Sequence, residues 1–222
     1  MKIALLFYGR LNKFKEHKDN LLNAIGTHND IDIFLSCSNE PDNIVSEFIE
    51  LYKPKAILNE TVILSSNIII NLEDKYISKF KYISKLGKNP KGYTNNMILH
   101  FMNKLNVIKL LLNYICTTNN KYDIVISLRL ELLLFNNFNF DNYINNDEYI
   151  YIPNCYDFDG VNDQIAYGNL EAMKKYMSIF NNMIYILNIR NNLLHPETLI
   201  KENIELNNLK IIRFNLNYIL DK

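Results

Sequence analysis

The sequence predicts an α/β fold: a three-layer α/β/α sandwich with a mainly parallel central sheet. Short apolar runs rich in β-branched residues alternate along the chain with longer segments that have helical apolar spacing. Charged and polar residues directly follow several of these runs. Alternating strands and helices are typical of parallel sheets covered by helices on both faces. In such folds ligands bind at the carboxyl ends of the strands, and ligand binding would explain why charged residues are found there.

Length and composition indicate one domain over residues 1–222 and exclude several classes of partner. The chain is 48% hydrophobic, which is enough for one substantial core. Its 24 basic and 24 acidic residues cancel, so nucleic acid is not an expected partner. Three distant cysteines lack the spacing of a zinc site or a disulfide framework. The apolar start is too short for a signal peptide, and no run is long enough for a transmembrane segment, so we expect a cytoplasmic protein.

The segment Tyr122–Phe135 contains the predicted central strand. Ile124–Leu128 is an almost continuous apolar run, as expected of a strand buried on both faces of a parallel sheet. Arg129 and Glu131 follow at its carboxyl end, and alternation places both side chains on one face. Two interpretations stay open: a ligand-binding pair, or an ion pair that closes the end of a core strand.

The first half of the chain reads as alternating strands and helices. Lys2–Tyr8 is the first predicted strand, and Gly9 and Arg10 follow it where a turn is needed. Arg10 either holds a diphosphate through forked hydrogen bonds or is simply solvated. Asp32 lies near the start of the second strand, Ile31–Ser36, and either holds a ribose or base or serves a turn. The remaining elements of this half are helices at Phe14–Ile25 and Pro41–Leu51 and a strand at Lys55–Leu64.

A polar region then separates this half from the clearest predicted helix. Ser65–Gly92 is rich in Lys, Asn and Tyr and ends in a cluster of Gly and Pro residues. It is either a loop over a site or a plain surface insertion. Tyr93–Ile115 has helical apolar spacing, and its first turn carries Asn95 and Asn96.

The second half resumes the alternation and gathers carboxylates in one loop region. Asp157, Asp159 and Asp163 all lie after a predicted strand, where aspartates either cap turns and helices or take part in chemistry. The elements here are a strand at Tyr149–Pro153, a loop at Asn154–Asn162, the segment Ile165–Gly168 and a helix at Asn169–Asn181.

The last predicted helix begins at Pro196 and runs to about Asn207. Proline at the first helical position and Glu197 in the first turn explain this start fully, whereas His195 is left without a structural reason. A last strand at Leu209–Leu216 and a short tail at Tyr218–Lys222 complete the chain.

Five short motifs follow one another in a familiar order. They are a first strand that ends in Gly-Arg, then DIF, YDIVISLRLE, NDQIAYG and HPE, at Phe7–Arg10, Asp32–Phe34, Tyr122–Glu131, Asn162–Gly168 and His195–Glu197. This order resembles that of glycosyltransferases with the GT-A (Rossmann-like) fold, especially small ones from large DNA viruses and bacterial surface-polysaccharide clusters. The resemblance covers most of the chain. It implies transfer of a hexosyl or deoxyhexosyl group from a nucleotide-diphosphate sugar to a hydroxyl of a glycan or glycoconjugate, in the host cytoplasm if the protein is viral.

The resemblance also implies roles for the end of the central strand. The family commonly has Asp-x-Asp there, or a variant with Arg first, and here the motif stands as Arg129-Leu130-Glu131. Carried over, Glu131 contacts the donor sugar or a divalent cation, Mn²⁺ or Mg²⁺, and Arg129 contacts the donor. Alternatively, Arg129 itself neutralises the diphosphate. Asp32 and Asn96 are further nucleotide-binding candidates.

Other positions take their expected roles from the same resemblance. Asp163 falls where the family has the acidic residue that faces the acceptor, so it is the expected general base if transfer inverts the anomeric centre. Gln164 would position it. His195 would supply a further metal or phosphate contact, and Gly9 and Arg10 would line the nucleotide cleft.

Two other functions remain open at this point. A sugar nucleotidyltransferase shares the layered fold, but it ordinarily has a Gly-rich loop with a lysine after the first strand, and FYGRLNKF contains one glycine. A non-catalytic nucleotide-sugar-binding module is the second, in which the departure from Asp-x-Asp marks lost activity. The retained Asp163 argues against the module.

Overall fold

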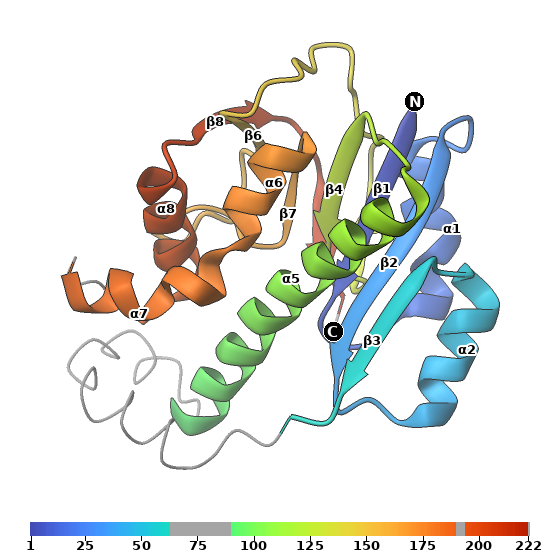
Figure 1. Ribbon diagram of the computed structural model, residues 1–222, viewed down its shortest axis with the longest axis horizontal. Coiled ribbons are helices and arrows are strands. Elements are labelled where there is room, and N and C mark those ends of the chain that lie inside the picture. The colour runs from blue at the N-terminus through green and yellow to red at the C-terminus, as the bar shows by residue number, and fades with distance from the viewer. Residues whose placement is uncertain (63–89, 190–193, 222) are drawn as a thin grey trace.

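A computed structural model describes residues 1–62, 90–189 and 194–221, and it confirms the predicted three-layer α/β sandwich (Figure 1). A seven-stranded sheet has the order β3-β2-β1-β4-β7-β6-β8. β7 is antiparallel to both of its neighbours, and the other paired strands are parallel, so the sheet is mainly parallel as predicted. The strands are β1 (Lys2–Tyr8), β2 (Asp30–Ser38), β3 (Ala56–Glu60), β4 (Ile124–Leu128), β6 (Tyr149–Pro153), β7 (Ile165–Gly168) and β8 (Lys210–Phe214).

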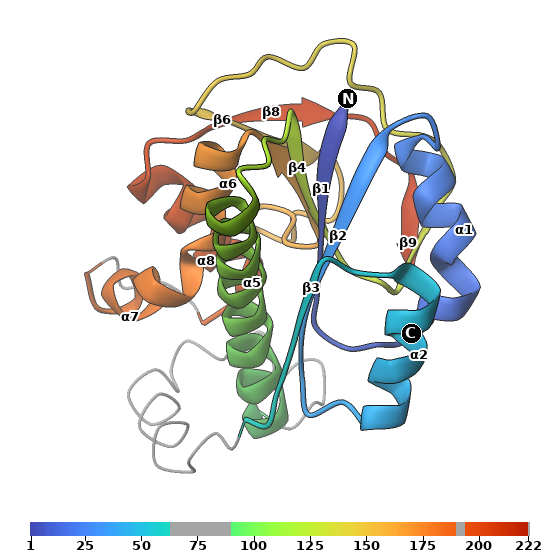
Figure 2. The ribbon, with the colours of Figure 1, turned by 45° about the vertical axis from the view of Figure 1, so that its right-hand side comes forward.

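Helices cover both faces of this sheet (Figure 2). α1 (Phe14–Ile25) and α2 (Asp42–Tyr52) pack on one face, and the long α5 (Pro90–Thr118) crosses the other. On the α5 side lie also α6 (Leu170–Met177), α7 (Ile179–Ile189) and α8 (Pro196–Leu206). None of the helices within the described ranges combines the length and apolarity that crossing a membrane requires.

The strand β1, next to the central β4, is buried on both faces because its side chains alternate between two cores. Ala4, Leu6 and Tyr8 point to the α5 side, and Leu5 and Phe7 point to the α1–α2 side. All five are at most 1% exposed. This explains why the first predicted strand has no polar alternation.

The chain changes direction across the sheet between β1 and β4. From β1 it proceeds outward through β2 to β3, and it then returns over the opposite face by α5 to enter β4 on the other side of β1. Six strands end at one edge of the sheet, and β7 begins there; we call this the carboxyl edge. In open α/β sheets, the carboxyl edge at such a reversal is where ligands bind.

The predicted helix Asn169–Asn181 is wrong as a single element. The structure breaks it at Ser178, so that α6 ends at Met177 and α7 begins at Ile179. The Ser178 hydroxyl donates to the Lys175 carbonyl oxygen at 2.7 Å, a local bond that competes with the helical ladder.

The predicted tail Tyr218–Lys222 is also wrong in part. Tyr218–Leu220 forms β9, which pairs antiparallel with β5 (Leu132–Leu134) in a second, two-stranded sheet. The pairing joins segments far apart in sequence, which local pattern does not reveal. It places the end of the described chain beside Glu131, whose carbonyl oxygen accepts from Asp221 N at 2.9 Å.

Other boundaries differ by shorter stretches. α5 begins at Pro90, so the last three residues of the predicted loop Ser65–Gly92 are helical, with proline at the permitted first position. Residues 63–89 lie outside the described ranges, so the rest of that loop and the end of the predicted strand Lys55–Leu64 are not covered. β2 is longer than the predicted Ile31–Ser36, and β8 is shorter than the predicted Leu209–Leu216.

The loop between β6 and β7 packs closely against the start of α8. A Cβ added to Gly160 would overlap main-chain atoms of Glu197 and Thr198. Val161 N donates to the Glu197 carbonyl oxygen at 3.0 Å in the same contact. A glycine is therefore required at position 160 for the two backbones to meet.

Gly160→Ala should lower the free energy of unfolding by about 1–3 kcal/mol, because backbone atoms of α8 cannot turn away as a side chain can. Urea unfolding followed by circular dichroism measures this. Asp159→Gly is the matched control, since Asp159 has φ 67°, which glycine adopts freely, and it should change stability by less than about 0.5 kcal/mol. Equal stability of the two variants would contradict the close contact.

Candidate functional site

The carboxyl edge at the β1–β4 reversal brings together several of the residues predicted from sequence. Gly9 directly follows β1 with φ 97° and donates its N–H to the Ser36 carbonyl oxygen at 3.0 Å. Arg10 follows and is exposed, and its Nη2 donates to Asn96 Oδ1 at 3.4 Å. This contact joins the end of β1 to the first turns of α5.

Arg129 and Glu131 form a two-pronged ion pair in the turn after β4. Arg129 Nε donates to Glu131 Oε2 at 3.1 Å, and Arg129 Nη2 donates to Oε1 at 3.0 Å. The Glu131 side chain is 4% exposed and that of Arg129 is 25% exposed. The ion pair considered from sequence is therefore present, and it fixes the orientation of the guanidinium. Two of its five N–H donors are engaged in these bonds.

Asp163 lies at the entry to β7, next to α5. Its Oδ2 is 3.2 Å from His100 Nε2, within ion-pair distance but without the alignment of a hydrogen bond. Burial alone would raise the pKa of Asp163, but the contact with His100 and the positive charges of Lys104 and Arg129 outweigh it and hold that pKa well below its usual range. Asp163 is thus an ionised carboxylate in a nearly dry setting.

Lys104 is a fully buried cation in the middle of the α5 interface. Its Nζ donates to the Asp163 carbonyl oxygen at 2.5 Å and to the Tyr176 hydroxyl at 3.2 Å. It also lies 5.0 Å from the ring centre of Tyr8 and 4.9 Å from that of Tyr176, so two aromatic faces help to replace water. Burial is the main cause that lowers its pKa to about 8, opposed by the charge of Asp163.

Tyr8 completes this group, which we call the buried cluster: Tyr8, His100, Lys104, Asp163 and Tyr176. The Tyr8 hydroxyl lies 3.0 Å from the Asp163 carbonyl oxygen and 3.1 Å from that of Gln164. The main chain that leads into β7 is therefore held from β1 and from α5 at once. A positioning role for Gln164 itself stays a prediction.

His100 is neutral near pH 7. Burial lowers its pKa to about 4, and the positive charges of Lys104 and Arg129 add to this, while Asp163 opposes it. The imidazole therefore stands beside the Asp163 carboxylate without forming a full charge pair at neutral pH.

His195 and Glu197 lie at the start of α8, close to the buried cluster. His195 Nε2 is 3.1 Å from Glu197 Oε2, and His195 Nδ1 is 3.2 Å from Thr198 Oγ1. Burial and then the negative charge of Asp163 raise the pKa of Glu197 to about 8, whereas burial lowers the pKa of His195. These contacts give His195 the structural reason that the sequence left open.

The side chains proposed as metal ligands do not fit a divalent cation. Both oxygens of Glu131 are taken by Arg129, and His195 faces Glu197 and Thr198. Across the described ranges, no group of three or more His, Cys, Asp or Glu side chains is placed to hold a metal ion. Mn²⁺ and Mg²⁺ are commonly held by one or two carboxylates together with substrate phosphates. The carboxylate proposed for that role, Glu131, is already paired with Arg129. We therefore derive no step through a metal.

Asp32 lies apart from these residues, near the start of β2 and so at the opposite end of the strand from the carboxyl edge. Its carboxylate accepts from the Tyr122 hydroxyl at 2.8 Å and is 3.5 Å from Lys2 Nζ and 3.4 Å from Lys55 Nζ. Local charge pairing accounts for it, and we do not retain it as a nucleotide ligand.

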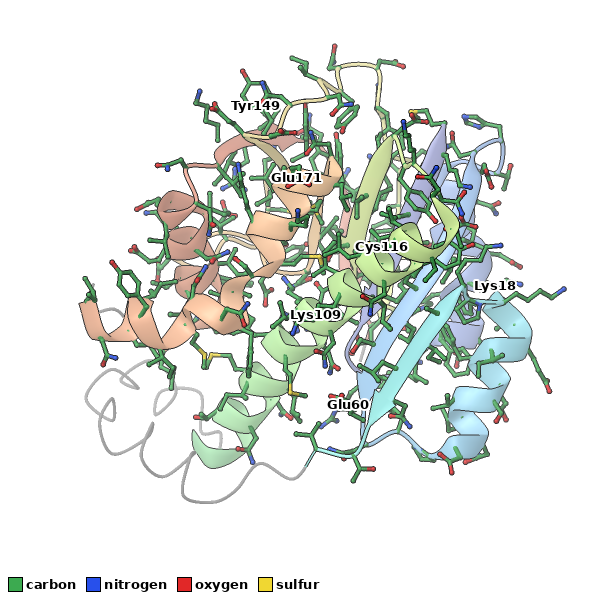
Figure 3. The ribbon with its side chains drawn as sticks, in the orientation of Figure 1. Lys18, Glu60, Lys109, Cys116, Tyr149 and Glu171 are labelled. Atoms are coloured by element: carbon green, nitrogen blue, oxygen red, sulfur yellow. The ribbon has the colours of Figure 1, made fainter. Side chains whose placement is uncertain are left out.

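Sequence reasoning missed His100 and Lys104. Both lie on the inner side of α5, where Lys104 contacts Asp163 and His100 contacts Tyr8. Lys109 and Cys116 are exposed on the same helix (Figure 3). The signal was present, since Lys104 stands one turn after Phe101 and interrupts the apolar stripe of the helix. A lysine in that stripe indicates a buried polar partner.

Comparisons with known proteins give likeness of structure only. No protein-family model and no curated protein matches the sequence. Glycosyltransferase GlyE of Streptococcus pneumoniae, in its apo form, is similar with a TM-score of 0.48 at 11% identity, over 95% of this chain and 44% of GlyE. A protein assigned as a nucleotide-diphospho-sugar transferase from Desulfovibrio desulfuricans has a TM-score of 0.46 at 8% identity, over 96% of this chain and 79% of its own. The chain thus spans less than half of GlyE, and at these values neither likeness assigns an activity.

The pKa of His100 predicts an acid-sensitive stability. In the unfolded chain His100 has its ordinary pKa of 6.5, and in the folded chain its pKa is about 4. The free energy of unfolding therefore has its full value above pH 6.5 and decreases as the pH falls toward 4, because the unfolded chain then binds the proton more readily. In the wild type this decrease amounts to up to about 3 kcal/mol, and we expect it to be absent from His100→Gln. Urea unfolding at pH 7 and pH 4.5 measures the difference, with His28→Gln as the exposed control. Equal pH slopes for wild type and His100→Gln would contradict it.

Proposed function

We propose that the protein is a glycosyltransferase that binds a nucleotide-diphosphate sugar at the carboxyl edge of β1 and β4 and transfers the sugar to a hydroxyl of a glycan or glycoconjugate. One observation carries this: two arginines follow the two strands that flank the reversal, and a buried, ionised carboxylate begins the next strand. The residues are Arg10, Arg129 and Asp163. The motif order and the α/β architecture support the same assignment.

The arginines suit the diphosphate of the donor sugar. A guanidinium presents several N–H groups in a fixed plane and pairs with two phosphate oxygens at once. Arg129 is already oriented by Glu131, so little side-chain freedom is lost when a phosphate binds. Arg10 is exposed and adds a second cation from the neighbouring strand. Together they offset the negative charge that grows on the diphosphate as it leaves.

Asp163 is proposed to receive the proton of the acceptor hydroxyl. The hydroxyl oxygen attacks the anomeric carbon, the bond from that carbon to the diphosphate oxygen breaks, and the hydroxyl proton passes to Asp163. A carboxylate with a low pKa is a weak base, but the attacking hydroxyl becomes strongly acidic as its new bond forms. The negative charge also favours the positive character of the anomeric carbon in the transition state.

Binding of UDP or GDP should raise the melting temperature of the protein, because a ligand stabilises the folded state that binds it. Arg10→Ala should weaken that binding by about tenfold or more, since a hydrogen bond to a charged group contributes about 1.5–3 kcal/mol. Lys121→Ala is the matched control, because Lys121 is exposed and precedes β4 at the opposite edge. Thermal shift with and without Mn²⁺ measures both. Equal affinity in the two variants would place the nucleotide elsewhere.

Asp163→Asn should lower turnover by about 10²–10⁴-fold while nucleotide binding survives, because the amide keeps the shape but loses the basic lone pair. The substrate is the nucleotide sugar that raises the melting temperature, and turnover is measured as the nucleoside diphosphate released from it. NMR of the product gives its anomeric configuration. Asp141→Asn, a change at an exposed carboxylate, is the control. Near-normal turnover of Asp163→Asn, or a retained configuration, would exclude this role.

A further inference from the structure

Two exposed aromatic side chains stand on the loop that follows β6. Tyr156 is 39% exposed and Phe158 is 55% exposed, and their ring centres are 6.1 Å apart at an interplanar angle of 30°. We call residues 154–160 the aromatic loop. Two adjacent rings in water lack the favourable free energy that burial in the core would give them, which suggests that their exposure serves a function.

The backbone of the aromatic loop is held in an unfavourable conformation. Tyr156 has φ 57°, Phe158 has φ 41° and Asp159 has φ 67°, so three non-glycine residues out of four occupy the left-handed region. Bulky side chains rarely adopt it, and each instance costs on the order of 1 kcal/mol or more. Such conformations persist only where surrounding contacts enforce them, and they gather at functional sites.

Hydrogen bonds within the loop and from Arg213, Asn162 and Tyr218 enforce this conformation. Arg213 donates twice to the Asp157 carboxylate, at 3.0 Å and 2.9 Å. Gly160 N donates to the Asp157 carbonyl oxygen at 2.7 Å, and Asn162 N donates to Asp157 Oδ1 at 3.0 Å. The Tyr156 hydroxyl donates to the Tyr218 carbonyl oxygen at 3.0 Å. The loop is therefore built to present its rings, with Asp157 as its centre.

The aromatic loop is connected directly to Asp163. The ring of Tyr156 packs on that of Tyr218, with centres 5.1 Å apart. Asn162 Nδ2 donates to the Tyr218 hydroxyl and to the Cys155 carbonyl oxygen, both at 2.6 Å. Asn162 immediately precedes Asp163, so the rings and the carboxylate belong to one hydrogen-bonded segment.

The strand order places Asp163 between the arginines and the rings. Along the carboxyl edge the sequence of elements is β1 with Arg10, β4 with Arg129, β7 with Asp163 and β6 with the aromatic loop. Neighbouring strands are about 5 Å apart, so β6 lies about 15 Å from β1. A donor held by the arginines would present its sugar toward Asp163, and the aromatic loop lies on the far side.

We propose that Tyr156 and Phe158 form an acceptor subsite that stacks a pyranose ring of a glycan, which rests on the proposed transferase function. One face of a β-gluco- or β-galactopyranose carries mainly C–H groups, whose positive edges are attracted to the negative face of an aromatic ring. Two side chains alone present far less area than the roughly 800 Å² per partner that a stable protein interface buries. We do not expect the rings to stack the nucleotide base, because Asp163 lies between the aromatic loop and the two arginines.

The chain contains 15 tyrosines but no tryptophan, so Phe158→Trp introduces a single tryptophan, which can be excited selectively over the tyrosines. Titration of this variant with methyl β-D-glucopyranoside, methyl β-D-galactopyranoside and lactose should shift its emission saturably, with affinities in the range of about 1–100 mM. Phe135→Trp is the matched control, because Phe135 is 61% exposed and lies outside the loop, and its emission should not respond. Glycerol at equal concentration controls for the solvent.

A second measurement avoids the added tryptophan. Saturation-transfer NMR should show lactose binding to the parent chain, and Phe158→Ala should weaken it by about threefold to tenfold. Phe158→Ala should keep the parent melting temperature and the nucleotide-induced shift, because the side chain is exposed and remote from the arginines. Tyr156→Ala is less suitable, since its hydroxyl also supports the loop.

The outcomes separate the two proposals. Glycoside binding at Phe158→Trp without any nucleotide binding would support stacking of a sugar on the rings, but it would overturn the transferase function and with it the role of the rings as an acceptor subsite. Nucleotide binding without any glycoside response would support the transferase and overturn the subsite. A response of Phe158→Trp to UDP or GDP but to none of the glycosides would show that the rings stack a base, which also overturns the subsite.

Discussion

The burial of one lysine constrains much of this molecule. The Lys104 ammonium is inaccessible to water, so its charge must be met by the protein: a carbonyl oxygen, a hydroxyl, two aromatic faces and a nearby carboxylate. These partners come from β1, α6 and the segment before β7. Their relative positions follow from the need to surround one cation, and the same segment carries Asp163. Removal of any one partner would leave the buried charge with less compensation.

The charges around the carboxyl edge balance at neutral pH. Lys104 and Arg129 are positive, Asp163 and Glu131 are negative, and the raised pKa of Glu197 leaves it mostly protonated. A neutral group of this kind can be buried at modest cost. A ligand that brings additional negative charge would meet the positive charge of the exposed Arg10 and the N–H donors of Arg129 that Glu131 does not engage.

Patterns of apolar residues sufficed for the architecture, because burial on both faces leaves a direct trace in a strand such as Ile124–Leu128. They did not reveal the reversed β7, which has four residues, nor the pairing of β9 with β5, which joins distant segments. Of the site, residues after strands could be anticipated, because strand ends meet at one edge. Side chains inside a helix, such as His100, could not be placed, because their partners lie on elements whose packing the sequence does not specify. Asp32 was wrongly expected at the site, because it lies near the start of β2 and the site lies at the other end of the strands.

The contact between Asp221 and the turn at Glu131 bears on how the protein is made. β5 cannot pair until β9 has been synthesised, although β5 itself emerges from the ribosome about ninety residues earlier. At translation speeds of about 5–20 residues per second, β5 and the turn before it, which carries Arg129 and Glu131, stay without the partner strand β9 for several seconds. During this interval the edge of β5 is open to other chains. The turn that carries Arg129 and Glu131 is thus completed only after the first parallel strands have already emerged.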